Sequence, residues 1–307
     1  MTLLAELFET SRDLGRIREI AGVLVRYGFT DVVGRLGLAG ALEKLGETFH
    51  WTEAAELVEM STAQRVRTAL EQLGPTFVKL GQLLSTRVDL FPPDWIEEFE
   101  RLQDQVAPVE FESFREQVRR DLGMQPEEAF ASFETRAIAA GSIAQVHGAV
   151  LHDGQRVVVK IRRPGIEQTV EADLRLLRRL ARIADEQLPD AARFRLPALV
   201  EQFARSIRLE LDLAAEARNV ERMAANLKAR FRRGQCPVVV PRIHREWSCV
   251  RINVQERIEG IPGQQVERLA AAGLDRRRIA VEGARTMLST IIEDGFFHAD
   301  PHPGNVM

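Results

Sequence analysis

The sequence predicts an α+β fold in which a helical region precedes a small antiparallel sheet with helices, and a further helical unit begins near the end of the chain. Three observations support this prediction. Apolar residues recur every three or four positions within residues 1–123, β-branched runs flank an Asp-Gly pair after residue 139, and a helical pattern returns at residues 276–294. A period near 3.6 is typical of amphipathic helices, and β-branched runs around Asp-Gly are typical of hairpins.

The composition is that of a globular protein from a reducing compartment. The 307 residues are 45% hydrophobic and 28% charged, and the net charge of −3 gives no reason to expect a nucleic-acid partner. Cys236 and Cys249 cannot build a disulfide framework and match no zinc-binding spacing. The first residues mix acids and bases, and no stretch approaches the ~18 consecutive apolar residues of a membrane span, so we expect neither a signal peptide nor a spanning helix.

The first 123 residues are predicted to be helical throughout. The stretch "LAELFETSRDLGRIREIAGVLVRYGF" has the amphipathic period, and Gly74-Pro75 and Pro92-Pro93 mark boundaries. Between these boundaries, "TFVKLGQLLSTRVDLF" is predicted to form a short helix. Further helices are expected from Asp94 to Leu122.

From Ala139 to Gly165 the pattern predicts a turn of small residues followed by a two-stranded hairpin, whose own turn is "HDGQ". Two helices are expected next, from Ile166 to Leu188 and from Leu196 to Arg233. A second β pair is expected in "VVVPRIHREWSCVRINVQERIEG", with its turn near Trp247, and a last helix follows from Arg276 to Asp294.

Lys160 lies among valines in "VVVKIRRP", on the second strand of the predicted hairpin. A buried ammonium is costly without a counter-ion or a phosphate. In protein kinases a strand lysine of the form V-A-I-K holds the α- and β-phosphates of ATP and pairs with a helix glutamate. A lysine that points to solvent is the alternative interpretation.

The segment before that strand, "AAGSIAQVHGAV", occupies the place at which a kinase positions its glycine-rich loop over the phosphates. The small residues of this segment are Ala139, Ala140, Gly141, Ser142 and Ala144. It has too few glycines for G-x-G-x-x-G, and by itself it is also compatible with a plain tight turn.

Two carboxylates, Glu210 and Glu216, lie in "LELDLAAEA" within the predicted helix Leu196 to Arg233. On a continuous helix they would stand about 120° apart around the axis, which implies two separate basic partners. Asp212 and Glu216 would share a face and repel each other unless a cation intervened. A solvated acidic face is the alternative interpretation.

The segment "FVKLGQ" places Lys79 and Gln82 three residues apart, so they point the same way from a helix. Gly81 lies between them and permits close approach of another backbone. Alone, this segment indicates no function.

The most specific pattern is the ending "HADPHPGN". Asp300 and Asn305 have the spacing of Asp and Asn in the kinase catalytic loop H-R-D-x-x-x-x-N. In that loop the aspartate accepts a hydroxyl proton or orients the acceptor, and the asparagine holds a Mg²⁺ that bridges phosphates. A metal site made of His298, Asp300 and His302 is the alternative interpretation.

Taken together and in this order, the motifs resemble the UbiB/AarF family of atypical kinase-like proteins, also called the ADCK family. The resemblance spans residues 75–307 and is carried by "FVKLGQ", "AAGSIAQVH", "VVVKIRRP", "ELDLAAEARN" and "HADPHPGN". The family has a K-x-G-Q helix ahead of its kinase fold, an alanine-rich loop in place of the glycine-rich loop, and an E-x-D motif in a long insertion. These motifs match Lys79–Gln82, Ala139–Ala144 and Glu210–Asp212.

The resemblance implies a protein-kinase-like fold with ATP and Mg²⁺ as cofactors. It implies a helical N-terminal extension with the K-x-G-Q helix over residues 1–123, an N-lobe with a helical insertion over 124–258, and the start of an incomplete helical C-lobe over 259–307. Lys160 is then expected to bind phosphate with Glu216 as its partner.

The other site residues follow from the same resemblance. Asp300 is expected to act as the catalytic aspartate and Asn305 as a Mg²⁺ ligand. The residues expected at the nucleotide are Ala139, Ala140, Gly141, Ser142, Ile143, Ala144, Val146, Lys160, Glu256 and Ile258, of which the last two lie in a hinge, Gln255 to Ile258. A regulatory ion pair between Lys79 and Glu210 is expected, in a group that also contains Gln82 and Asp212.

The sequence departs from the family pattern in two places. The family loop commonly reads A-A-A-S-I-G-Q-V-H, whereas here Gly141 and Ala144 exchange the small residue types, which leaves the nucleotide preference open. The D-F-G aspartate is expected roughly twenty residues after "HPGN" and is absent, so the sequence resembles a C-terminally truncated member of the family.

The expected function is that of an ATP-binding atypical kinase or ATPase supporting ubiquinone (isoprenoid quinone) biosynthesis. The expected partners are a nucleotide, lipid quinone precursors and quinone-biosynthesis enzymes, and the expected location is the cytoplasm with peripheral contact to the inner face of a bacterial plasma membrane. Two alternatives stay open: a nucleotide-binding pseudoenzyme or scaffold, and a metal-dependent hydrolase that uses His298, Asp300 and His302.

Overall fold

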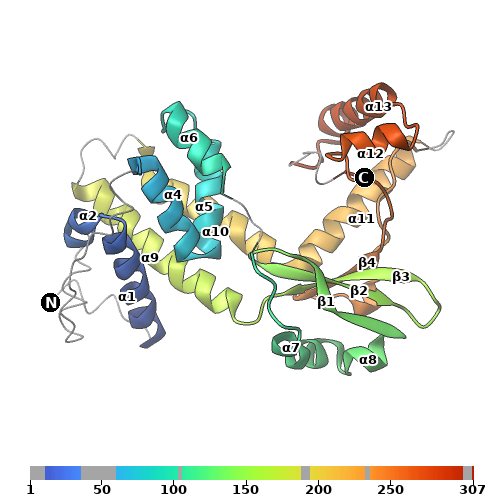
Figure 1. Ribbon diagram of the computed structural model, residues 1–307, viewed down its shortest axis with the longest axis horizontal. Helices are drawn as coiled ribbons and strands as arrows, with labels where there is room; N and C mark the ends of the chain where they lie inside the picture. Colours follow the sequence, from blue (N-terminus) through green and yellow to red (C-terminus); the bar gives the residue numbers. More distant parts are fainter. Residues whose placement is uncertain (1–10, 36–59, 103–105, 188–193, 232–235, 300–305) are drawn as a thin grey trace. The chain divides into compact units, whose positions relative to one another are not determined.

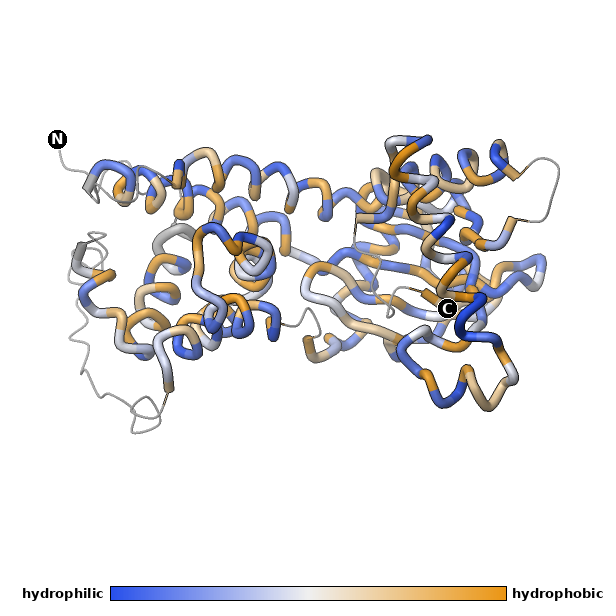
Figure 2. The backbone as a smooth tube through the Cα atoms, turned by 90° about the horizontal axis from the view of Figure 1, so that it is seen from above, coloured by the Kyte–Doolittle hydropathy of each residue, from blue (hydrophilic) through white to orange (hydrophobic). Residues whose placement is uncertain are grey.

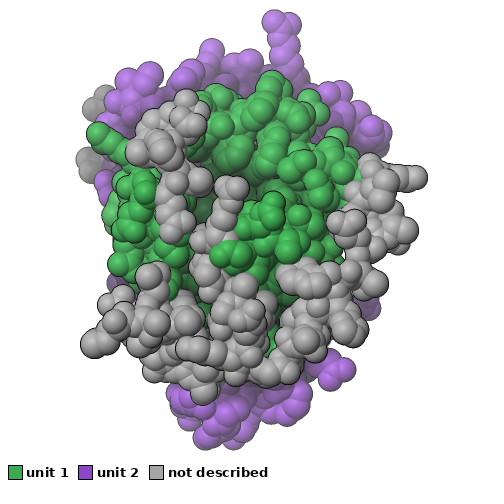
Figure 3. Space-filling model, turned by 90° about the vertical axis from the view of Figure 1, so that its left-hand side faces the viewer, with its two compact units in different colours: residues 1–109, 140–144, 163–211 green, residues 110–139, 145–162, 212–307 purple. Residues whose placement is uncertain are grey.

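The chain forms two compact units that interleave along the sequence (Figure 3). The computed structural model describes residues 11–35, 60–102, 106–187, 194–231, 236–299 and 306–307. Unit 1 comprises residues 1–109, 140–144 and 163–211, and unit 2 comprises residues 110–139, 145–162 and 212–307. The three-part division into residues 1–123, 124–258 and 259–307 stays a prediction.

The described part of unit 1 is mainly helical. Its helices are α1 (Ser11–Arg26), α2 (Thr30–Arg35), α4 (Thr62–Leu73), α5 (Pro75–Ser85), α6 (Pro93–Glu100), α9 (Ile166–Gln187) and α10 (Leu196–Leu211). Ser61 caps α4 through a capping box with Gln64, which satisfies backbone N–H groups at the start of the helix. Gly74, at a φ of 90°, ends α4, and Pro75 begins α5 because proline is tolerated in the first turn of a helix.

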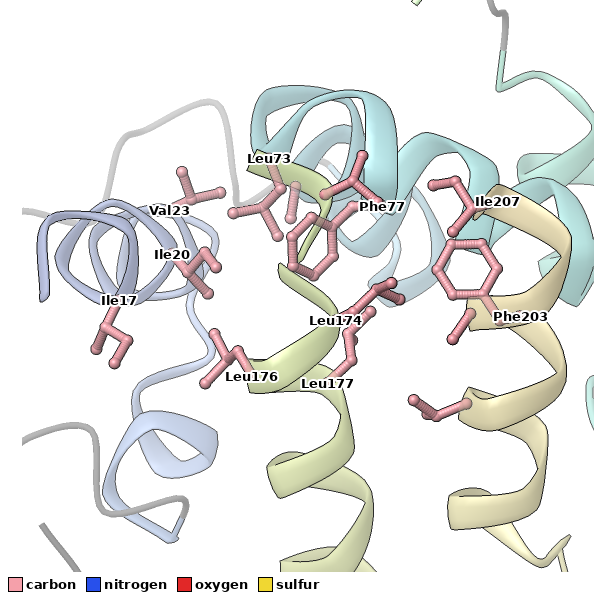
Figure 4. Packing of buried hydrophobic residues seen from close by; sticks show 14 of the residues in the cluster. Ile17, Ile20, Val23, Leu73, Phe77, Leu174, Leu176, Leu177, Phe203 and Ile207 are labelled. Carbon is pink, nitrogen blue, oxygen red and sulfur yellow. The ribbon is translucent and has the colours of Figure 1, made fainter. Parts of the chain in front are cut away.

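The core of unit 1 is built where α1, α4, α5, α9 and α10 meet (Figure 4). Hydrophobic and hydrophilic positions alternate along these helices, so each has one apolar face (Figure 2). Ile20, Phe77, Leu174 and Phe203 come from four of them and point toward one another. Each fully buried side chain of this size stabilises the fold by roughly 1.5–3 kcal/mol relative to exposure.

A buried ion pair also joins three helical segments of unit 1. Arg16 of α1 donates from Nε to Asp173 Oδ1 at 2.6 Å and from Nη2 to Asp173 Oδ2 at 3.1 Å, and it also donates to the carbonyl of Leu73. Asp173 of α9 is fully buried. Two bonds from one guanidinium to one carboxylate fix the relative geometry of α1 and α9 as well as offsetting the cost of burial.

Unit 2 contains the sheet. Its elements are α7 (Glu112–Leu122), α8 (Pro126–Ala129), most of β1 (Ser132–Ala140) and β2 (Ala144–Val150), β3 (Arg156–Arg162), α11 (Leu213–Arg230), a 3₁₀ turn (Arg245–Trp247), β4 (Ile252–Glu256), α12 (Val266–Ala271), α13 (Arg276–Ser289) and a π-helical turn (Thr290–Asp294). Figure 1 shows α7 and α8 on one side of the sheet and α11 on the other.

The described strands form one sheet in the order β1-β2-β3-β4. β3 and β4 are antiparallel, and Lys160 is paired with Asn253. Val157, Val159 and Ile161 are fully buried in a cluster that includes Phe111 and Phe114. One face of the sheet is therefore its core, and the alternate residues of β3 face the other side.

The expected α+β class with a small antiparallel sheet is confirmed, but two details of the sheet are corrected. The strand β1 precedes the predicted hairpin, and Ala139 and Ala140 end this strand instead of forming a turn. The second predicted β pair does not form two paired strands, because β4 pairs with β3 and the described segment before it contributes only two isolated bridges, from Ile243 to Gln255 and from Cys249 to Ile252. Pro237 and Pro241 lack the N–H that a paired strand needs.

The helix predictions also need two corrections. The expected helix Ile166 to Leu188 is present as α9, but the expected helix Leu196 to Arg233 is broken. Asp212 has an extended conformation (φ −93°, ψ 90°) and its side chain accepts a hydrogen bond from Ala215 N, so α10 ends and α11 begins there. The last α-helix, α13, ends at Ser289, and residues 290–294 form a π-helical turn.

Candidate functional site

Lys160 and Glu216 form an ion pair on the polar side of the sheet in unit 2. Lys160 Nζ lies 2.7 Å from Glu216 Oε2, and both side chains are about one-third exposed, at 33% and 38%. A pair this exposed stabilises a fold by roughly 1 kcal/mol or less. An ammonium has three donors, so Lys160 can bind an anion while it keeps its bond to Glu216.

The break at Asp212 determines where Glu216 lies. Since Asp212 is the N-cap of α11, Glu216 stands in the first turn of that helix, where the helix dipole favours negative charge. The prediction that Asp212 and Glu216 share one face of a continuous helix is therefore wrong. Asp212 instead pairs with Arg218 at 3.1 Å.

The neighbour of Lys160 in the sheet is Asn253, a residue that the sequence interpretation missed. Asn253 is fully buried, and neither Nδ2 nor Oδ1 has a hydrogen-bond partner among the described residues. Buried amides are normally paired. An unpaired amide next to the Lys160 ammonium therefore fits a site that binds polar ligand groups. The alternation in "INVQE", with Asn253 and Gln255 on one face and Val254 on the other, was the available pattern.

The alanine-rich segment forms a closed turn between β1 and β2. Gly141 N donates to Ala144 O at 2.9 Å, and Ser142, Ile143 and Ala144 are buried. Ala140 to Ala144 belong to unit 1, whereas Ala139 and Val146 belong to unit 2 with Lys160.

The expected hinge residues follow directly from β4. Glu256 pairs with Val157 in the sheet, its backbone N donates to Arg242 O at 2.8 Å, and its carboxylate accepts from Arg242 N at 3.2 Å. Ile258 lies just after the strand and is half-buried. Their contact with an adenine base stays a prediction.

The second ion pair lies within unit 1. Lys79 Nζ of α5 is 3.1 Å from Glu210 Oε2 of α10, as the pairing in the sequence interpretation requires. Gln82 does not join an ion pair, because its Nε2 donates to Leu102 O at 3.0 Å. Gly81 accommodates the side chains of Leu102 and Leu70 rather than a backbone. The K-x-G-Q segment therefore attaches α5 to its neighbours at Lys79, Gly81 and Gln82.

The residues of the predicted catalytic loop, Asp300, His302 and Asn305, lie outside the described residues. His298 is described and is exposed. Within the described ranges, no three His, Cys, Asp or Glu side chains are grouped so that they could hold a metal ion. The assignments of Asp300 and Asn305, and the alternative metal site, stay predictions.

A family model described as the ABC1 atypical kinase-like domain matches residues 101–307. The chain belongs to this family. Among curated proteins, the ABC1 kinase-like chain is 34% identical over 298 residues to "Probable protein kinase UbiB" of Aliivibrio fischeri, which covers 97% of the chain and 54% of that protein. It is 41% identical over 268 residues to the protein of the same name from Xanthomonas campestris pv. campestris, which covers 86% and 47%.

The ABC1 kinase-like chain therefore spans about half the length of the curated relatives it matches. Among solved structures, it resembles "The complex structure of Rv3197-erythromycin from Mycobacterium tuberculosis", with a TM-score of 0.52 and 28% identity over 82% of this chain and 61% of that one. This likeness and the family match establish a kinase-like fold. Among the helices the structure describes, none combines the length and apolarity needed to cross a bilayer.

Proposed function

We propose that the chain binds ATP, with Lys160 on the phosphates, and that its parent protein uses the nucleotide as an atypical kinase or ATPase. The observation that carries the proposal is the 2.7 Å contact between Lys160 of β3 and Glu216 of α11 in a chain of the ABC1 atypical kinase-like family. A strand lysine paired with a helix glutamate is the arrangement by which kinases hold the α- and β-phosphates.

Each described residue has a role in this proposal. Lys160 donates to phosphate oxygens, Glu216 holds the ammonium in place, and the buried amide of Asn253 supplies neutral hydrogen-bonding groups beside it. ATP supplies the transferable phosphoryl group. The expected Mg²⁺ ligand Asn305 and the expected catalytic residue Asp300 complete the proposal from outside the described residues.

The test is nucleotide binding by the chain, measured by isothermal titration with ADP and ATP. Lys160→Met keeps the length of the side chain and removes its charge, so it should weaken binding about tenfold or more, because hydrogen bonds to charged groups contribute roughly 1.5–3 kcal/mol. Lys228→Met on the exposed side of α11 is the matched control and should change affinity less than about twofold. If Lys160→Met and the unaltered chain bind ADP and ATP with equal affinity, Lys160 does not bind the phosphates.

The proposed biological role is support of isoprenoid quinone biosynthesis, with lipid quinone precursors and quinone-biosynthesis enzymes as partners at the cytoplasmic face of the membrane. It is supported by the UbiB name of the curated relatives. We expect the gene that encodes this chain to restore quinone content, measured by mass spectrometry, in a bacterium deficient in a gene of this family. The Lys160→Met form should not. Restoration by both forms would favour the scaffold alternative.

A further inference from the structure

The two outer strands of the sheet differ in what is bonded to their outer edges. β1 and β4 are the outer strands of the described sheet. The segment before β4 is bonded to it, since Glu256 N donates to Arg242 O at 2.8 Å. From outside the sheet, β1 is bonded at its last residue, where Val106 N donates to Ala140 O at 3.3 Å, and no such bond is described for residues 132–139. Most of the outer edge of β1 therefore has backbone groups that can pair with another strand.

The side chains of β1 alternate between its two faces. Phe133 and Ala137 are half-buried, and the ring of Phe133 lies 4.7 Å from that of Phe111 between centroids. Glu134 and Arg136 are exposed. Residues two apart in a strand share a face, so Glu134 and Arg136 lie together on the face opposite Phe133.

Both charged side chains of β1 can take a further partner. The carboxylate of Glu134 is 57% exposed and lies 3.6 Å from Arg257 Nη1, and a carboxylate can accept bonds from more than one cation. Arg136 forms no ion pair within the described ranges. The exposed face of β1 thus presents one negative and one positive charge, two positions apart.

These two charges match those of a second copy of the same strand. In an antiparallel pair related by a two-fold axis at Thr135, Glu134 of each copy stands opposite Arg136 of the other. Opposite charges across an antiparallel pair attract, whereas parallel pairing in register would place like charges side by side. Charges on an edge strand usually prevent association, but the charges of β1 are complementary to their own antiparallel copy.

We propose that two copies of the chain associate through β1, paired antiparallel about Thr135, so that the sheets of two copies form one continuous sheet. The proposal does not rest on nucleotide binding, because Lys160 and Glu216 lie outside β1. Both ion pairs across the contact lie in water and the contact is small, so the association is weak and sensitive to salt.

The test is sedimentation equilibrium of the chain up to about 500 µM, a range that reaches weak contacts of this size. The unaltered chain should approach the mass of a dimer. Glu134→Arg and Arg136→Glu each turn two attractive pairs into two repulsive pairs, so each should raise the dissociation constant about tenfold or more.

Mixing the two variants gives the decisive measurement. In a mixed dimer, both cross-strand pairs again join opposite charges, so an equimolar mixture should associate about as tightly as the unaltered chain. Native mass spectrometry separates the mixed dimer from the two dimers of a single variant by mass. A mixture that stays monomeric would overturn the proposed pairing, as would an unaltered chain that is monomeric over the whole concentration range.

The control places the same change elsewhere in unit 2. Glu116→Arg on α7 reverses a carboxylate that is 60% exposed, and it should change the dissociation constant less than about twofold. An equal loss in Glu116→Arg would show that net charge governs association and would overturn the role of β1. Full association by both β1 variants would place the contact on another surface. If Glu134→Arg does not fold, as judged by circular dichroism, Glu134→Lys takes its place with the same expected results.

Discussion

The two lysine–glutamate pairs look alike in sequence but differ in their surroundings. Lys79–Glu210 joins two helices of unit 1, and its lysine is only 18% exposed on a helix secured by Gly81 and Gln82. Lys160–Glu216 joins a strand and a helix of unit 2, and beside it lies a buried amide with no partner among the described residues. The first pair lies in a packed interface between helices. The second pair lies next to an amide whose hydrogen-bonding groups have no partner among the described residues. We infer that the first is chiefly structural and the second is suited to a ligand.

The largest expected loss of stability concerns the buried ion pair that joins the helices of unit 1. Asp173→Ala leaves Arg16 without its buried partner, and breaking a buried ion pair in this way costs about 3–5 kcal/mol. We expect hydrogen exchange, read by mass spectrometry, to rise in peptides of α1, α5 and α9 before it rises in the strands of unit 2. Glu201→Ala, which removes an exposed partner of Arg178, should cost far less, because water screens an exposed ion pair. Similar costs for both variants would contradict the structural role of the Arg16–Asp173 pair.

The next effect concerns the glycine of the K-x-G-Q segment. A Cβ on Gly81 would lie 2.2 Å from Leu102 Cδ1 and 3.0 Å from Leu70 Cδ1, so Gly81→Ala should destabilise unit 1 by about 1–3 kcal/mol through overpacking. Gly15→Ala in α1 is the matched control. It meets nothing within 4 Å and should stabilise its helix by about 0.5–1 kcal/mol. Denaturant unfolding measures both, and stabilisation by Gly81→Ala would show that α5 is not tightly seated.

The effect of pH should be smaller, since it involves a single proton, and it should fall on unit 2. His147 is fully buried against Phe111 and Phe133, and burial lowers its pKa below the ordinary 6.5, although its bond to the Glu134 carbonyl acts in the opposite direction. The folded state therefore binds this proton less readily than the unfolded chain does, so its contribution to stability is complete above about pH 6.5 and is lost as the pH falls below that value. His147→Gln, which does not titrate, should lose less unfolding free energy between pH 7.5 and 5.5, as followed by urea denaturation. Identical losses would exclude His147 as the source.

The smallest effect should come from the pair of unit 1. Glu210→Gln removes the charge from a carboxylate that is 44% exposed, so the global cost should be about 1 kcal/mol or less. We expect faster hydrogen exchange within α5 and a change in ADP affinity of less than about threefold. Glu216→Gln should weaken ADP binding more than Glu210→Gln does. Equal effects on ADP would remove the distinction between the two pairs.

Local patterns in the sequence were sufficient for several elements. Gly74-Pro75 separates two helices because each of these residues restricts or extends the conformations of its own backbone. The turn between β2 and β3 likewise depends on an Asp-Gly pair that is adjacent in the chain. The motifs in their order were sufficient for the family, because they combine residue types with spacing. The pairing of Lys160 with Glu216 came from that resemblance, and the continuous helix from which two partners were first argued does not exist.

The tertiary structure decided what depends on residues distant in sequence. The partner of β4 is β3. The sequence of β1 alternates only weakly between apolar and polar residues, and this largely exposed segment forms a strand because it pairs with β2. The break at Asp212 and the bonds from Arg163 to carbonyls of the alanine-rich loop likewise follow no local pattern, and the alternation around Asn253 does not show that its amide is buried without a partner among the described residues. Sequence by itself determined most of the helices, the hairpin of β2 and β3, the family and the residues that carry charge. Packing decided which of those charges are partnered, because burial and hydrogen bonding are properties of the assembled fold.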